Sequence, residues 1–144
     1  HCDLMMGNQY YTTAGPCTVM CLLETAAQAI TDTCSGREVL SGVAASKGVA
    51  TNFTTGMEAR FMGECAYAVA GMPVEQVNAL LDKLVAMYEK NYKTAPAGKP
   101  YEACYDTKTL LPTQEYLDVY QEAVKIMTDL GLDYWTKKEK FLQD

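Results

Sequence analysis

The sequence predicts an α/β chain that is mostly helical, with one or two strands at its N-terminal side. Four segments repeat apolar side chains at helical spacing and are bounded by capping residues, Gly or Pro. Only residues 1–6 and part of 37–53 are typical of strands. Because so small a sheet is not a stable unit, either the first helices pack as a bundle or the missing strands lie upstream in a parent chain.

Composition excludes several functional classes. The 144 residues include 12 Lys and Arg against 18 Asp and Glu, a formal net charge of -6. Nucleic acid is therefore not expected as the main partner, because phosphate binding needs concentrated positive charge. A membrane protein is not expected either, because no apolar run approaches the roughly 20 residues that span a bilayer. With 49% hydrophobic and 21% charged residues, the chain is expected to form one globular domain.

The first residues and the cysteines indicate the setting of the protein. His1-Cys2-Asp3 has neither an initiator Met nor the layout of a secretory signal, so we expect a piece of a longer chain. Six cysteines in this length fall short of a disulfide scaffold. With eight oxidisable methionines, they favour free thiols in a reducing cytoplasm.

The N-terminal side is predicted to run from strand to loop to helix. Residues 1–6 alternate loosely and form a short strand that Gly7-Asn8 ends, followed by a loop over 9–15. Pro16 fits the first turn of a helix that continues over 17–34. Helical spacing of apolar side chains along this run supports the assignment.

A small-residue stretch and a second helix come next. Residues 37–53 are predicted to hold a half-turn of helix and a short strand. The second helix is predicted over 57–70, with Thr54 and Thr55 as caps and Gly71 at its end. Its Ala, Gly and Cys content permits close packing against a neighbour.

The C-terminal half is predicted to hold two amphipathic helices joined by a connector. Pro73 sets the first turn of the third helix, whose apolar stripe is Val74, Val77, Leu80, Leu81, Leu84, Val85 and Tyr88. The prolines in 91–113 predict a long surface connector without regular helix. Thr113 caps the fourth helix over 114–130, and the Lys-rich tail from Tyr134 is predicted to be frayed.

Two cysteines raise the question of a metal site. Cys17 and Cys21 are spaced i, i+4, which would place both thiols on one helical face as two of four ligands to a soft metal. However, no second Cys or His pair stands at finger-like spacing, and the only histidine is His1. We therefore favour buried thiols that pack as small hydrophobes, and no metal site is predicted.

Three glutamates lie in segments that are predicted to pack into the protein, where a carboxylate needs a hydrogen-bonding or charged partner, or has a function. Glu24 lies within an apolar run, unless the helix boundary faces solvent there. Glu58, Arg60 and Glu64 are predicted to form one Glu-Arg-Glu ion network that joins two elements, because structural networks outnumber catalytic ones. Without an internal His or a GxxxxGK[ST] loop, serine hydrolase and P-loop chemistry are excluded.

The stretch 8–13, Asn-Gln-Tyr-Tyr-Thr-Thr, is the strongest candidate for a binding site. It offers an amide, two phenols and two hydroxyls at the carboxyl end of the predicted strand. Such neutral donors and acceptors suit a small polar ligand. The alternative is a turn with half-buried tyrosines and Gln9 facing water.

This stretch and its surroundings resemble the monomethylamine–corrinoid protein methyltransferases. The likeness begins with His1-Cys2-Asp3-Leu4-Met5 and QYYTTAGPC at 9–17. It continues in TGMEARFMGE at 55–64, VAGM at 69–72 and EACYD at 102–106, and fades in the tail. It therefore covers most of the chain.

The resemblance implies that the chain is the C-terminal part of a TIM barrel. Residues 1–36 would supply a late strand and its helix, 55–131 the closing helices, and 132–144 a tail. A barrel needs about 200 residues or more, which would explain why so few strands are present here. The family also implies a homo-oligomer.

The activity that the resemblance implies is transfer of the methyl group of monomethylamine to the Co(I) corrinoid of a partner protein, releasing ammonia. The family uses pyrrolysine, whose imine ring would bind and orient the methylammonium. Gln9 and Tyr11 match positions that line this pocket. Pyrrolysine belongs to an earlier strand, and nothing in 1–144 replaces it, so the isolated chain is expected to be inactive.

A second hypothesis needs no catalysis. Here the chain would be a helical interaction or oligomerisation module. One of two apolar faces would dock another protein: Leu80, Leu81, Leu84 and Tyr88, or Leu117, Tyr120 and Val124.

Overall fold

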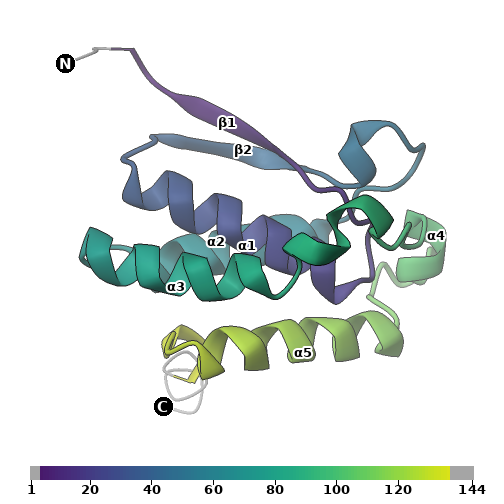
Figure 1. Ribbon diagram of the computed structural model, residues 1–144. Coiled ribbons are helices and arrows are strands. Elements are labelled where there is room, and N and C mark those ends of the chain that lie inside the picture. Colours follow the sequence, from purple (N-terminus) through teal and green to yellow (C-terminus); the bar gives the residue numbers. More distant parts are fainter. Residues whose placement is uncertain (1–3, 137–144) are drawn as a thin grey trace.

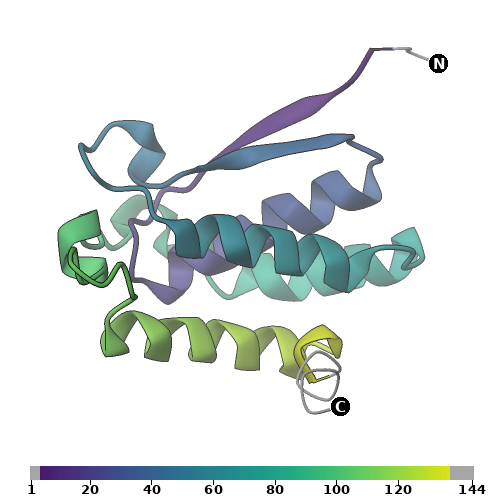
Figure 2. The ribbon, with the colours of Figure 1, turned by 180° about the vertical axis from the view of Figure 1, so that it is seen from behind.

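A two-stranded parallel sheet lies over a layer of helices. The computed structural model describes residues 4–136. Strands β1 (Gly7–Tyr11) and β2 (Val39–Ala44) pair in parallel, and helix α1 (Val19–Cys34) connects them. In Figures 1 and 2 the helices lie on one side of the sheet, and no described helix covers its opposite face. The predicted mostly helical α/β class is confirmed.

The position of the first strand corrects the sequence prediction. The strand spans Gly7–Tyr11, whereas the prediction placed it at 1–6 and a loop from residue 9. Leu4 and Met5, the apolar residues that suggested the earlier strand, are 72% and 76% exposed. Tyr10, by contrast, is fully buried. Residues 1–3 lie outside the described part of the chain.

Helix α1 is the central element of the fold. It begins after Thr18, whose Oγ1 accepts a hydrogen bond from the Cys21 amide at 3.3 Å. Pro16 therefore lies in the preceding loop, not in the first turn as predicted. Eleven of the 16 helical residues are buried, because α1 packs against the other helices and against the sheet. The stretch 37–53 holds β2 and a 3-10 turn, Ser46–Gly48, as predicted.

Helices α2 (Gly56–Val69) and α3 (Val74–Ala86) follow their predicted positions closely. Thr55 caps α2 in a reciprocal capping box with Glu58, which satisfies two amides that the first turn leaves free. Pro73 lies directly before α3, and its fixed backbone φ angle of −59° suits the start of a helix. Of the predicted apolar stripe, Val77, Leu80 and Leu84 are buried, whereas Val74 is 53% exposed.

The connector between α3 and α5 contains helical turns that the prediction did not include. A 3-10 segment covers Glu89–Thr94, and a single turn, α4, covers Tyr101–Cys104. The connector is tied to the loop after β1, since the Gly15 amide donates to Pro96 O at 3.0 Å. Gly98 has φ +74°, and a Cβ there would lie 2.3 Å from the Gly15 carbonyl carbon. Only glycine permits this approach.

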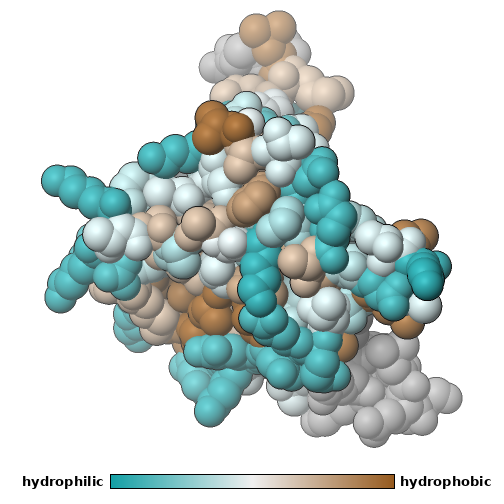
Figure 3. Space-filling view, turned by 90° about the vertical axis from the view of Figure 1, so that its right-hand side faces the viewer, coloured by the Kyte–Doolittle hydropathy of each residue, from teal (hydrophilic) through white to brown (hydrophobic). Residues whose placement is uncertain are grey.

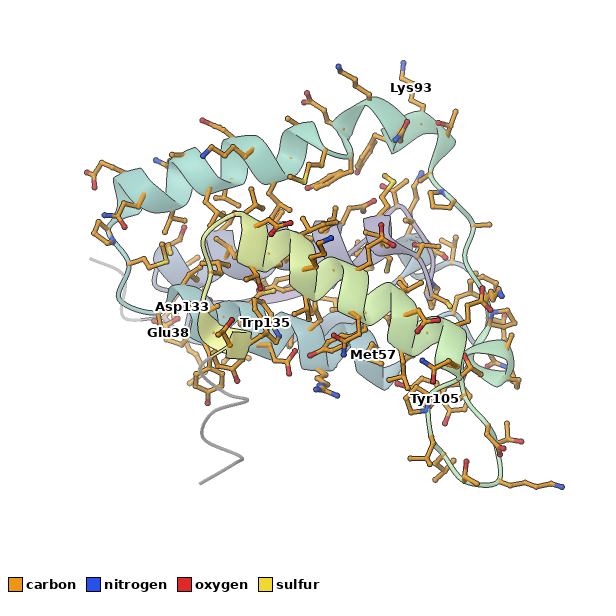
Figure 4. All side chains as sticks on the ribbon, turned by 90° about the horizontal axis from the view of Figure 1, so that it is seen from below. Glu38, Met57, Lys93, Tyr105, Asp133 and Trp135 are labelled. Atoms are coloured by element: carbon orange, nitrogen blue, oxygen red, sulfur yellow. The ribbon has the colours of Figure 1, made fainter. Side chains whose placement is uncertain are left out.

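Helix α5 (Gln114–Asp129) forms the layer farthest from the sheet, capped by Thr113 as predicted. Its buried stripe is Tyr116, Tyr120, Ala123 and Met127. The following turn is not frayed as the tail prediction held, because Trp135 is only 6% exposed. In Figure 4 Trp135 lies against α2 beside the end of α5. The predicted fraying of 137–144 lies outside the described residues.

The core is formed between α1, α2, α3 and α5. Its largest fully buried side chains include Phe61, Tyr116, Leu22 and Ile30. The apolar faces that the second hypothesis assigned to docking belong partly to this core, since Leu80, Leu84 and Tyr120 are buried there. Among the described residues, no helix is long and apolar enough to cross a membrane.

Candidate functional site

The open face of the sheet carries the two residues that the sequence selected. Along β1 the burial alternates, with Tyr10 turned toward the helices and Gln9 and Tyr11 on the exposed side. The prediction of a loop at Gln9 and Tyr11 is wrong, because both residues belong to strand β1. Residues i and i+2 of a strand share a face, so Gln9 and Tyr11 stand side by side.

The Gln9 side chain is positioned by the neighbouring strand. Gln9 pairs with Gly42 at a register shift in the ladder. The Ser41 hydroxyl lies 2.7 Å from Asn8 O and 3.2 Å from Gln9 Oε1, which makes it a donor to this region of β1. Because Gly42 has no side chain, the space beside the Gln9 amide stays open.

A tight turn positions Tyr11. The Lys47 amide donates to Thr12 O at 2.7 Å, and the Ser46 amide donates to Ala14 O at 3.2 Å. Gly48 has φ +70°, and a Cβ on it would lie 3.1 Å from Tyr11 Cε1. Ser46 and Lys47 also have positive φ, at 53° and 59°, which is unfavourable for residues with side chains. The turn after β2 therefore packs against the Tyr11 ring.

Glu24 stabilises the loop that follows β1. Its carboxylate accepts hydrogen bonds from the Thr13 amide and, at 3.3 Å, from the Ala14 amide. The side chain is buried, so the suggestion of a solvent-facing helix boundary is wrong. Burial raises the pKa of Glu24, and the two amides and Lys47 oppose that rise. The carboxylate thus fixes the loop at the carboxyl end of the strand.

The cysteines do not form the pair that the spacing suggested. Cys17 has φ 60° and precedes α1, so it does not share a helical face with Cys21. Cys21 is fully buried with its Sγ 3.3 Å from Thr12 Oγ1, and burial raises the pKa of its thiol well above the usual value. In residues 4–136 no group of three or more His, Cys, Asp or Glu side chains is placed to hold a metal ion.

The predicted Glu-Arg-Glu network is in fact two separate networks. Glu58 accepts hydrogen bonds from the Thr55 amide at 2.8 Å and from the Tyr116 hydroxyl. Glu64 instead accepts from Arg60 Nε at 3.1 Å, Tyr120 OH at 2.6 Å and Trp135 Nε1 at 3.0 Å. Sequence reasoning missed the Glu58 to Tyr116 pair. The Thr55-x-x-Glu58 capping pattern would have assigned Glu58 correctly.

Near the carboxyl ends of the strands lie Gln9, Tyr11, the loop after β1 that Glu24 holds, and the turn after β2 that contains Lys47. Figure 3 views the molecule from this end, where hydrophilic surface predominates and apolar patches are scattered. The set offers an amide, a phenol and a carboxylate, which can hold a small polar or cationic molecule by hydrogen bonds and charge.

Comparison with known proteins gives consistent matches. A family model described as monomethylamine methyltransferase MtmB matches residues 1–132. Over 130 residues the chain is 65% identical to the monomethylamine methyltransferase MtmB1 of Methanosarcina barkeri strain Fusaro and 64% identical to MtmB of Methanosarcina mazei. The crystal structure of the Methanosarcina barkeri monomethylamine methyltransferase superposes with a TM-score of 0.89 at 64% identity.

These matches cover most of this chain but a minor part of its relatives. Each alignment spans 90% of the chain and 28% of the relative. The chain therefore spans little more than a quarter of the length of the proteins that it resembles.

Proposed function

Since the chain belongs to the monomethylamine methyltransferase MtmB family, we propose that it is the C-terminal part of a TIM-barrel enzyme that transfers the methyl group of monomethylamine to the Co(I) corrinoid of a partner protein. Its strands would be late barrel strands, and its helices would close the barrel. The matched length supports this reading, because a barrel needs about 200 residues or more. The isolated chain is then expected to be inactive.

One observation carries the proposal. Gln9 and Tyr11 lie side by side on the face of the sheet that no described helix covers. In a barrel this face lines the interior, and active sites form at the carboxyl ends of the strands. Tyr11 is the last residue of β1 and is 57% exposed. Both side chains are thus placed to reach a molecule held inside a barrel.

In the proposed reaction, Gln9 and Tyr11 would orient a small cation. Pyrrolysine, supplied by an earlier strand of the complete protein, would provide an electrophilic imine. The Gln9 amide can donate and accept hydrogen bonds, and the Tyr11 phenol can do the same. An amide and a phenol are both weak nucleophiles, so neither would compete with Co(I) for the methyl group. Their role would be to hold the methylammonium carbon in line with the incoming metal.

The residues present fit that role. Gly42 opposite Gln9 leaves room beside the amide, and the Gly48 turn fixes the Tyr11 ring. The Ser41 hydroxyl near Gln9 Oε1 restrains the amide without filling its donor positions. A site pre-positioned by two strands and a turn loses little entropy on binding.

The first test is the variant Gln9→Ala in the complete protein. We expect turnover to fall by about 10- to 100-fold, because a positioning contact is removed. The free energy of unfolding should change by less than about 0.5 kcal/mol, since Gln9 is exposed. The measurement is corrinoid methylation by monomethylamine, followed spectroscopically, together with a denaturant titration.

Tyr67→Phe is the matched control. Tyr67 is 75% exposed in the last turn of α2, beside Thr33 near the end of α1, and its variant should turn over like the unmodified enzyme. Unchanged turnover in Gln9→Ala would remove Gln9 from the site. If the complete protein does not methylate the corrinoid at all, the proposed activity itself is wrong.

A further inference from the structure

A tyrosine-lined cleft opens beside Tyr11. It has a volume of about 240 Å³ and is lined by Tyr11, Glu24, Gln28, Tyr88 and Tyr92. Water occupies about 30 Å³ per molecule in the liquid, so the cleft has room for a ligand of a few heavy atoms. Its residues come from β1, from α1 and from the segment after α3.

The floor of the cleft is acidic and its rim is aromatic. Glu24 is only 4% exposed, whereas Tyr11 and Tyr92 are 57% and 55% exposed. The carboxylate therefore lies at depth, and two rings stand at the opening. Burial and the nearby Glu24 charge raise the pKa of Tyr88 to about 12, so this phenol stays protonated beside the carboxylate.

The Glu24 carboxylate keeps acceptor capacity. The amides of Thr13 and Ala14 and the Thr13 hydroxyl donate three hydrogen bonds to it, while an ionised carboxylate has about four acceptor positions. Lys47 acts on Glu24 electrostatically but does not line the cleft. Among residues 4–136 the lining includes no basic side chain, so the net charge of these lining residues is negative whenever Glu24 is ionised.

We propose that this cleft binds a small alkylammonium ion, with the ammonium group toward Glu24 and the alkyl group against the tyrosine faces. A carboxylate and several aromatic faces around one small space favour a cation over a neutral or anionic ligand. On the proposed function, which this inference extends, the ion is methylammonium. Tyr11 belongs both to the cleft and to the open sheet face, so the cleft would hold substrate beside the reaction site.

The experiment is a titration of the full chain with 13C-labelled methylammonium chloride, followed by NMR at constant ionic strength set with KCl. We expect saturable shifts and contacts from the methyl protons to tyrosine ring protons. Tyr92→Ala should weaken binding by about two- to fivefold, the effect of one exposed cation–π contact. Tyr92→Phe keeps the aromatic face and should bind like the unmodified chain.

Further variants make the test decisive. Glu24→Gln should weaken binding more than Tyr92→Ala. Because Glu24 also stabilises the loop, the exposed Tyr92 variants test the proposal without disturbing the fold. Tyr67→Ala, an exposed tyrosine on α2, is the control and should not change the affinity.

Two results would overturn the proposal. One is equal affinity for methylammonium in Tyr92→Ala and the unmodified chain. The other is an equal response to methanol, a neutral ligand of the same size, which would show no preference for a cation. Either result leaves the Gln9→Ala turnover test untouched, so failure of this site is separable from failure of the proposed function.

Discussion

The buried glutamates of the described residues lie in two regions of the molecule, and they differ in the donors that they bind. At the strand ends, Glu24 accepts hydrogen bonds from two consecutive backbone amides of one loop. Between the helices, Glu58 and Glu64 accept from side chains that lie 56 to 71 positions away in the sequence, on and after α5. Figure 4 shows α5 next to α2, the helix that carries both glutamates. The first arrangement shapes a loop, and the second joins helices.

This difference suggests that separate carboxylates control the stability of the fold and the geometry of the candidate site. A carboxylate that holds helices together is expected to control the free energy of global unfolding. A carboxylate that holds one loop is expected to control the geometry of the site beside it. Three predictions test this separation, starting with the one that has the largest expected effect.

Glu58→Ala should destabilise the chain by about 3 kcal/mol, because it removes the buried acceptor of the Thr55 amide and one of the two hydrogen bonds of the Tyr116 hydroxyl, whose other partner is Thr55 Oγ1 at 3.0 Å. Glu24→Ala is the comparison and should cost about 1 kcal/mol, since its amide donors belong to a single loop and the contact joins no helices. Urea denaturation followed by circular dichroism measures both. Equal losses in the two variants would break the distinction between the regions.

Trp135→Phe should cost about 1.5 kcal/mol. The variant loses the 3.0 Å hydrogen bond from Nε1 to Glu64, while a ring remains to stack on Phe61, whose centroid lies 5.7 Å away. Tyr67→Phe, an aromatic change at a position that is 75% exposed on α2, is the control for the same denaturation experiment. A loss of several kcal/mol in Trp135→Phe would mean that ring packing, not the hydrogen bond, anchors this turn.

The pH dependence is the smallest expected effect. Burial raises the pKa of Glu58 above its ordinary value of 4.5, so the folded state binds this proton more tightly than the unfolded state. The stability from this group is therefore present below pH 4.5 and is lost as pH rises through the folded-state pKa. The free energy of unfolding of the unmodified chain, relative to that of Glu58→Gln, should fall as pH rises from 4 to 7. A constant or growing difference contradicts this assignment.

Local sequence signals predicted the helices well because those signals are themselves local. Thr113 caps α5 through its own side chain, and Thr55 and Pro73 mark the starts of α2 and α3. The strand was misplaced because Leu4 and Met5 have an apolar pattern but no neighbour to cover them. Pairing with β2 and burial of Tyr10 decide where the strand lies, and the pairing depends on residues more than 30 positions away.

The sequence by itself determined the helical content and the caps, because spacing along the chain carries that information, and the family resemblance pointed to Gln9 and Tyr11. Only the tertiary structure decided that these two side chains share an open sheet face, that Glu58 and Glu64 belong to separate networks, and that Tyr88 and Tyr92 meet Glu24 at one cleft. Such contacts join residues distant in sequence, and the packing of α1 against the sheet and the other helices selects them.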